Sequence, residues 1–128
     1  MILDSSAVVA VVLEETGYEA LLERIRHAAS VAIGAPTLLE SELVLTGRMG
    51  EAARAQLLTL VTDGNVIVLP FHEGHWREAG NAFLRYGKGR HPAGLNYGDC
   101  MTYATARLAR EPLLCLGDDF VQTDIELA

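Results

Sequence analysis

Acidic side chains follow short apolar runs near both ends of this 128-residue chain. Asp4 ends the first apolar stretch, and Asp118 and Asp119 follow the run Pro112–Leu116. Asp99 lies where a helix is predicted to start. In an open α/β fold, the carboxyl ends of parallel strands and the following helix N-termini meet along one edge of the sheet. We therefore expect these distant carboxylates to meet in space.

Carboxylates that are brought together repel one another, and a hard divalent cation with oxygen ligands is the usual remedy. Mg²⁺ and Mn²⁺ favour such ligands and keep several water molecules. A cation of this kind activates water and stabilises charge on phosphoryl oxygens. The acids therefore predict a metal-dependent site that acts on phosphate, and none of the four histidines is required for it.

Each acid also has a simpler interpretation. An Asp near a helix start, such as Asp99, is most often a cap or a partner of the helix dipole. Asp4 follows a run that is predicted to be a buried strand, where an acid needs a partner or a ligand. Glu40 and Glu42 lie about 200° apart on a helix, so only one of them can face the site. Glu40 is favoured because it is nearer the preceding strand end.

Length and composition predict one domain over residues 1–128. Half of the residues are hydrophobic, which argues against disorder. The longest apolar run, Ala7–Leu13, is far shorter than the roughly 20 residues of a membrane span, so no membrane association is expected. Cys100 and Cys115 are too few for a disulfide scaffold or a zinc cluster, and they predict packed thiols in a reducing cytoplasm.

Apolar runs and helical periodicities alternate along the chain. Strands are predicted over residues 1–4, 31–34, 66–69 and 113–116, and the run Val66–Leu69 is the clearest of them. Helices are predicted over residues 5–13, 17–29, 36–48, 51–62, 72–86 and 97–110. Ser5 or Ser6 is expected to cap the first helix, and Asn96 the last. This alternation predicts a three-layer α/β/α sandwich with a central parallel sheet of four to five strands.

A glycine-rich loop at Gly87–Gly94 contains the cations Lys88 and Arg90. The net charge of −7 opposes nucleic-acid binding in general, but bound cations would offset part of it and a local basic patch can still contact phosphates. The simpler interpretation is a solvated loop. Further candidate cations are Arg85 beside the loop, and Arg48 and Arg54 in a second patch.

Four segments carry a resemblance to a known family. They are Met1-Ile2-Leu3-Asp4-Ser5-Ser6-Ala7, Pro36-Thr37-Leu38-Leu39-Glu40, Leu95-Asn96-Tyr97-Gly98-Asp99-Cys100 with Tyr103-Ala104, and Pro112-Leu113-Leu114-Cys115-Leu116-Gly117-Asp118-Asp119-Phe120 with Thr123-Asp124. In this order, and over nearly the whole chain, they resemble PIN-domain proteins. More closely, they resemble the VapC-type toxin ribonucleases of bacterial toxin–antitoxin pairs.

The resemblance implies a PIN-like fold with an acidic quartet of Asp4, Glu40, Asp99 and Asp118. Mg²⁺ or Mn²⁺ would be bound by Asp4, Asp99 and Asp118, with Asp119 as the alternative to Asp118. This chain has Cys-Leu-Gly where the family often has Thr or Ser, so the fourth acid stays open between these two.

The resemblance also implies function and partners. It implies an endoribonuclease that cleaves transfer or ribosomal RNA and is neutralised by a VapB-type antitoxin, which inserts an Arg or Lys into the acidic site. Ser6 matches a small hydroxyl of the family and would contact substrate together with Lys88 and Arg90, although Ser6 could equally serve as a helix cap. A homodimer is expected, with Gly17–Ala29 and Glu51–Thr62 as candidate interfaces, and a heterotetramer or larger assembly with the antitoxin.

Other classes fit the residues less well. A haloacid-dehalogenase-like phosphatase needs an Asp where this chain has Ser6, and a well-placed Lys where the single lysine, Lys88, is in a loop. A receiver domain needs an Asp after its third strand, where Pro70 follows instead. The remaining alternative is a degenerate PIN module that binds RNA or a protein without cleavage.

Overall fold

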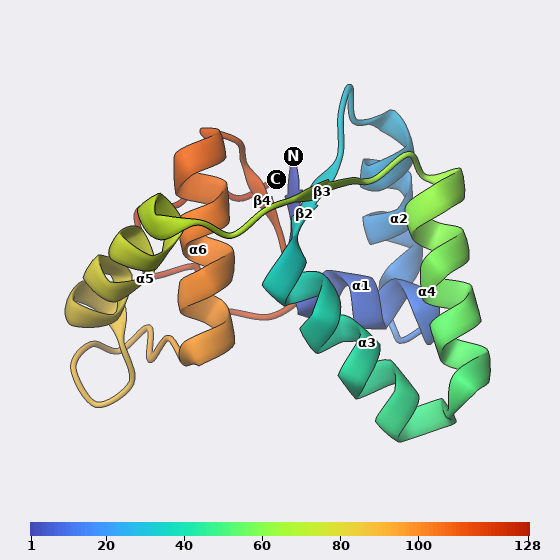
Figure 1. The fold of residues 1–128 in the computed structure, drawn as a ribbon, viewed down its shortest axis with the longest axis horizontal. Coiled ribbons are helices and arrows are strands. Elements are labelled where there is room, and N and C mark those ends of the chain that lie inside the picture. The colour runs from blue at the N-terminus through green and yellow to red at the C-terminus, as the bar shows by residue number, and fades with distance from the viewer.

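Six helices surround a four-stranded sheet in the computed structural model, which describes residues 1–128 (Figure 1). In chain order the elements are β1 (Ile2–Leu3), α1 (Ser5–Val12), α2 (Tyr18–His27), β2 (Ala32–Gly34), α3 (Ala35–Met49), α4 (Glu51–Asp63), β3 (Ile67–Leu69), α5 (Glu73–Tyr86), α6 (Tyr97–Ala109) and β4 (Leu113–Leu114). The strand order is β3-β2-β1-β4, and all neighbouring strands are parallel. The predicted sandwich and its four-stranded parallel sheet are confirmed.

Successive residues of the central strands face opposite helical layers. Leu3 and Leu114 belong to a core with residues of α1, α2, α3 and α4. Ile2 and Leu113 belong to a second core with residues of α5 and α6. Figure 1 shows α5 and α6 on one side of the sheet and the other helices on the opposite side. Because both faces are covered, these strands have no polar alternation in the sequence.

The strand predicted most clearly, β3, lies at an edge of the sheet. Its side chains Ile67 and Val68 are 54% and 43% exposed. Their β-branched and aliphatic character correctly predicted a strand, but it did not predict burial, because β propensity reports fit to a pleated surface rather than position in the sheet.

The buried face of α4 also differs from the face that its apolar residues indicate. Ala52, Ala55 and Leu58 recur at helical spacing in the sequence, yet all three are exposed. The helix instead buries Ala53 and Leu57, one helical turn apart, against the core of α1 and α3. Apolar residues occur on several sides of α4, so the sequence pattern did not indicate which face is buried.

All four strands end at the same edge of the sheet, opposite the two chain termini (Figure 1). Asp4 follows β1 there, α3 begins directly after β2, and Cys115 follows β4. The helices α3 and α6 are joined near this edge by a buried hydrogen bond between Thr37 Oγ1 and Thr102 Oγ1, 2.9 Å long. None of the helices has the length and apolar content needed to cross a bilayer.

The threonine pair gives a test of how α3 and α6 are held together. Replacing Thr37 by Val should lower the free energy of unfolding by about 1–2 kcal/mol, because the hydroxyl of Thr102 then loses its buried partner. The double variant Thr37→Val/Thr102→Val should lose less unfolding free energy than the sum of the two single variants. Each single change leaves one buried hydroxyl without a partner, whereas the double change removes both hydroxyls. Simple additivity in urea unfolding would contradict this role.

Candidate active site

Asp4 occupies the junction between β1 and α1 and is only 5% exposed. Its side chain is the N-cap of α1, where the expected caps were Ser5 or Ser6. Asp4 Oδ2 accepts hydrogen bonds from the backbone N–H of Ser6 and from Ser6 Oγ. Ser6 Oγ in turn accepts from the backbone N–H of Leu116 at 2.9 Å. Ser6 therefore ties the acid after β1 to the chain that follows β4.

Asp99 lies in the first turn of α6 and is part of its cap. Asn96 Oδ1 accepts from the N–H of Asp99 at 2.9 Å, and Asp99 Oδ2 accepts from the N–H of Asn96 at 2.8 Å. This reciprocal pair is a capping box, which fixes the orientation of the carboxylate. Asp99 therefore caps the helix through Oδ2, and its Oδ1 accepts no hydrogen bond and remains available to a ligand.

Glu40, on α3, points at the start of α6. A Cβ atom at Gly98 would lie 2.6 Å from Glu40 Oε2, so the carboxylate occupies the space that a side chain at this position would need. Glu42 pairs instead with Arg54 at 2.7 Å. Of the two acids on α3, Glu40 is therefore the one beside Asp4 and Asp99.

The charges of these acids act on one another. Burial raises the pKa of Glu40 above its ordinary value, and the negative charges of Asp4 and Asp99 raise it further. Burial also raises the pKa of Asp99; the Asn96 hydrogen bond opposes this rise, and the charges of Asp4 and Asp119 add to it. Residues from three separate elements therefore share one negative field.

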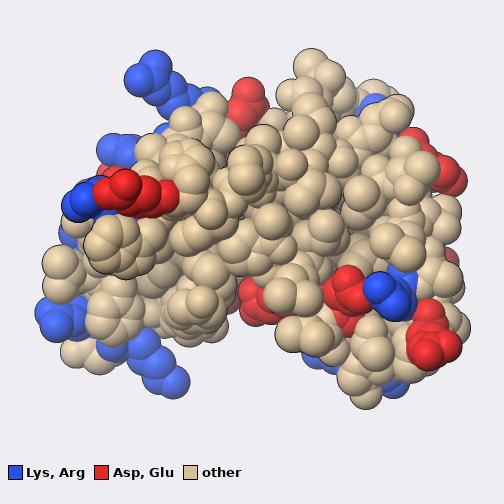
Figure 2. Space-filling model, in the orientation of Figure 1, with Lys and Arg blue, Asp and Glu red and all other residues tan.

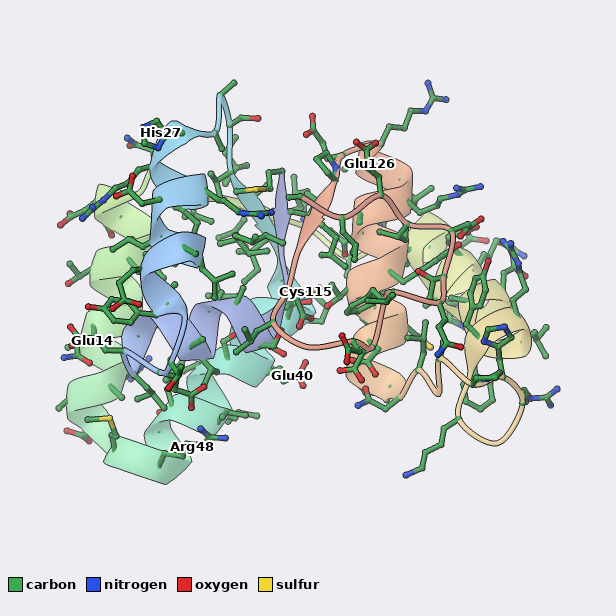
Figure 3. The ribbon with its side chains drawn as sticks, turned by 180° about the vertical axis from the view of Figure 1, so that it is seen from behind. Glu14, His27, Glu40, Arg48, Cys115 and Glu126 are labelled. Carbon is green, nitrogen blue, oxygen red and sulfur yellow. The ribbon has the colours of Figure 1, made fainter.

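Both candidates for the fourth acid, Asp118 and Asp119, lie on the irregular segment after β4. Asp118 and Asp119 are both exposed. The charge of Asp119 contributes to the raised pKa of Asp99. Burial raises the pKa of the nearby Cys115 thiol to about 11, and Asp4, Asp119 and Asp118 contribute to this rise. Figure 3 shows Glu40 and Cys115 in the region between the two helical layers.

The carboxylates have oxygens available for a cation. Asp4 Oδ1, Asp99 Oδ1 and both oxygens of Glu40 accept no hydrogen bond from the protein. No buried side-chain oxygen or nitrogen lacks a partner, so these free oxygens face solvent. An all-oxygen donor set is the chemistry that suits Mg²⁺ or Mn²⁺. No three of these side chains are close enough to form a ready-made metal cluster, so water would have to complete the coordination.

Lys88 and Arg90 lie on the loop between α5 and α6, and neither forms an ion pair. The loop is closed at its base by hydrogen bonds from Lys88 N to Leu95 O and from Leu95 N to Tyr86 O. The Arg90 guanidinium lies 5.7 Å from the centre of the Phe83 ring. Figure 2 shows most of the visible basic side chains along the left side of the molecule, where this loop lies at the lower corner, with acidic side chains spread over the rest of the surface.

The other predicted cations are neutralised by acids. Arg85 pairs with Asp124 at 3.1 Å, Arg48 with Glu15 at 2.8 Å, and Arg54 with Glu42 at 2.7 Å. The second basic patch therefore presents little free positive charge. The arginine count of a segment cannot reveal such pairing, because the acidic partners lie in other parts of the sequence.

Two contributors, Gly98 and Asp124, lie in segments that carry the family resemblance but were assigned no role from the sequence. Gly98 directly precedes Asp99, and a glycine in a helical first turn indicates close approach by another group. Asp124 lies five residues after Asp119 and binds three side chains on α5 and α6. Its role could not be predicted from spacing, because its partners lie 17 to 39 residues away.

Comparison with known proteins places the chain in a family. A PIN-domain family profile matches residues 1–126. The VapC ribonuclease Mb2004c of Mycobacterium bovis is 48% identical over 127 residues, which cover 98% of this chain and 91% of the relative. Ribonuclease VapC36 of Mycobacterium tuberculosis has the same identity and coverage. Ribonuclease VapC30 of the same species is 36% identical over 98% of this chain and 95% of its own length.

Solved structures share the fold at much lower identity. The crystal structure of M. tuberculosis VapC20, a sarcin–ricin loop cleaving toxin, matches with a TM-score of 0.80 and 15% identity, covering 99% of this chain and 97% of that one. VapBC2 from Rickettsia felis, bound to a promoter DNA fragment, matches with a TM-score of 0.78 and 13% identity, covering 99% and 96%. This chain therefore belongs to the PIN-domain family, and within it to the VapC ribonucleases.

Proposed function

We propose that this protein is a Mg²⁺- or Mn²⁺-dependent endoribonuclease toxin that cleaves transfer or ribosomal RNA in the cytoplasm. The observation that carries the proposal is the shared field of Asp4, Glu40 and Asp99, with free oxygens at the carboxyl edge of the sheet. Relatives with 48% identity are named ribonucleases. A degenerate module without cleavage is not favoured, because every acid position of the family pattern is filled.

Each acid has a proposed role. Asp4, Asp99 and a fourth acid would hold the cation through their free oxygens, directly or through bound water. The charge of Asp119 on Asp99 supports Asp119 as that acid, although the sequence favoured Asp118. When bound, the cation would supply Lewis-acid stabilisation of phosphate charge and would activate water. The raised pKa of Glu40 makes its carboxylate a better acceptor for a proton of the attacking water.

The three residues expected to contact RNA have two different proposed roles. Both hydrogen bonds of Ser6 lie within the protein, which supports a role in orienting Asp4 rather than the direct RNA contact expected from sequence. Lys88 and Arg90 are free of acidic partners, which supports contacts to RNA phosphates. With a net charge of −7, the chain needs such a local cationic loop to bind RNA.

We also propose that a VapB-type antitoxin neutralises the site by inserting an Arg or Lys among the carboxylates. The negative charges of Asp4, Asp99 and Asp119, which add to the effect of burial on the pKa values of Glu40 and Asp99, support the binding of a cationic side chain there. The structure from Rickettsia felis is of VapBC2 bound to promoter DNA, which supports a complex with an antitoxin, and we propose that this complex is a heterotetramer or larger.

A homodimer would cover an apolar face formed by α3, α5 and α6. Several large side chains on this face are exposed, namely Leu39, Leu43, Trp76, Phe83 and Tyr97. Two hollows of about 350 and 470 Å³ lie between them, and both are bounded by Phe71, Tyr97 and Met101. This exposed surface supports an interface here in preference to the helices at Gly17–Ala29 and Glu51–Thr62.

The first test is loss of cleavage. Asp4→Asn keeps an N-cap of equal quality but removes a negative charge that would bind the cation. With Mn²⁺ present, its rate of RNA cleavage should fall at least about a hundredfold, measured by 5′-end mapping of total RNA. Asp63→Asn, at the exposed end of α4, is the matched control and should cleave normally. Equal cleavage by wild type and Asp4→Asn would refute the catalytic role, and RNA binding without cleavage by wild type would favour the degenerate module.

The repulsion among the acids is measurable in metal-free protein. Because the pKa of Glu40 is raised by folding, the unfolded state releases this proton first, and stability falls as pH rises through the folded pKa. Glu40→Gln should therefore be more thermostable than wild type at pH 7.5, and the difference should vanish below about pH 4. Glu19→Gln, an exposed change on α2, is the control. A gain that is the same at every pH would contradict this electrostatic account.

The loop cations are tested by salt dependence. In the Asp4→Asn background, which prevents cleavage, Lys88→Ala/Arg90→Ala should weaken RNA binding. The double change should also reduce the slope of log K against log salt by about 1.4–1.8, because each lost phosphate contact contributes about 0.7–0.9. Arg77→Ala, whose side chain pairs with Glu73, should change the slope little. An unchanged slope in the double variant would show that RNA binds elsewhere.

A further inference from the structure

Asp124 gathers three side chains from α5 and α6, and we call this group of four the Asp124 clamp. Tyr103 Oη donates to Asp124 Oδ1 at 2.6 Å, and Arg85 Nη2 donates to Oδ2 at 3.1 Å. Arg107 lies 3.7 Å from the same Oδ2. Tyr103 is fully buried, and its hydrogen bond is the main reason that the pKa of Asp124 is lowered.

The clamp anchors the C-terminal end of the segment that carries Asp118 and Asp119. Residues 115–123 contain neither helix nor strand, so no backbone ladder fixes Asp118 and Asp119. The segment is held at its start by the bond from Leu116 N to Ser6 Oγ and in its middle by Phe120, which is 1% exposed. Asp124 supplies the third anchor, immediately after the segment. Only this anchor reaches back to α5 and α6 through polar contacts.

The same clamp reaches the cationic loop. Arg85 also donates to Tyr86 Oη at 2.8 Å, and its guanidinium lies 4.8 Å from the centre of the Tyr86 ring. The Tyr86 ring lies edge-on to His91, with the ring centres 5.2 Å apart. His91 belongs to the loop that carries Lys88 and Arg90. One chain of contacts therefore links the acid-bearing segment to the proposed phosphate-binding loop.

We propose that Asp124 is a positioning residue with two effects: it anchors the segment that carries Asp118 and Asp119, and it keeps the charge of Arg85 away from bound RNA. This inference rests on the proposed function. Without Asp124, the segment loses an anchor, so cation binding and cleavage weaken. Arg85 at the same time becomes a free cation beside the loop, so RNA binding strengthens.

These opposite effects separate positioning from simple stabilisation. The arginines of the clamp are about half exposed, and ion pairs of this kind contribute little to stability. A residue that merely stabilised the fold would weaken cation binding and RNA binding together. Only a residue that orients one group and neutralises another would change the two affinities in opposite directions.

The test compares Asp124→Ala with Glu126→Ala, which removes an acid two residues further along the chain whose side chain forms no hydrogen bond or ion pair. In Asp124→Ala, Mn²⁺ affinity by calorimetry should fall about fivefold or more, and kcat for RNA cleavage about tenfold. RNA affinity, measured in the Asp4→Asn background, should rise about threefold. The slope of log K against log salt should become steeper by about 0.7–0.9, which corresponds to one additional phosphate contact. Hydrogen exchange of the Val121 and Thr123 amides should quicken while that of α1 does not change.

Tyr103→Phe provides a second variant that removes only the hydroxyl. It should lower Mn²⁺ affinity and quicken exchange in the segment without raising RNA affinity, because Asp124 still binds Arg85. If Asp124→Ala does not fold, Tyr103→Phe alone decides the anchoring claim. Equal behaviour of Asp124→Ala and Glu126→Ala, or a joint loss of both affinities, would overturn the inference. Wild type that neither binds Mn²⁺ nor cleaves RNA would instead overturn the proposed function.

Discussion

Repulsion between carboxylates at one edge of a parallel sheet is the constraint on which the rest of this structure depends. Asp4, Glu40 and Asp99 come from three elements that are separated by up to 95 residues, and folding brings their charges into one field. Each is oriented by a neighbour rather than neutralised: Ser6 holds Asp4, and Asn96 holds Asp99. Gly98 leaves the space that Glu40 needs. Folding therefore brings these negative charges together at a cost in free energy, and a bound cation would reduce that repulsion.

The cations of the chain are distributed in a way that preserves this field. Arg48, Arg54 and Arg85 are paired with acids that lie outside the site. Lys88 and Arg90 remain unpaired on a loop beside α6, the helix that begins with Asp99. The negative charge of Asp4, Glu40 and Asp99 and the positive charge of Lys88 and Arg90 are thus kept on separate elements, and no basic side chain of the chain pairs with these acids.

Sequence reasoning predicted the parts of the structure that depend on local pattern. Unbroken apolar runs predicted the parallel strands, and the end of each run predicted where the acids would meet. It could not predict that β3 lies at an edge or that α4 buries Ala53 and Leu57, because each depends on neighbours distant in sequence. The cap of α1 was placed one or two residues too late, because Asp4 and the serines that follow it are equally good caps. The choice between Asp118 and Asp119 is of the same kind, since adjacent residues on an irregular segment have no periodicity to separate them.

The most direct test of the central claim is anomalous diffraction from crystals of the protein grown with Mn²⁺. The account predicts a single dominant site at the carboxyl edge of the sheet, with Asp4 and Asp99 as direct ligands and Asp119 closer to the ion than Asp118. An ordered manganese bound elsewhere, or an edge with no anomalous signal while these carboxylates stay apart, would contradict it.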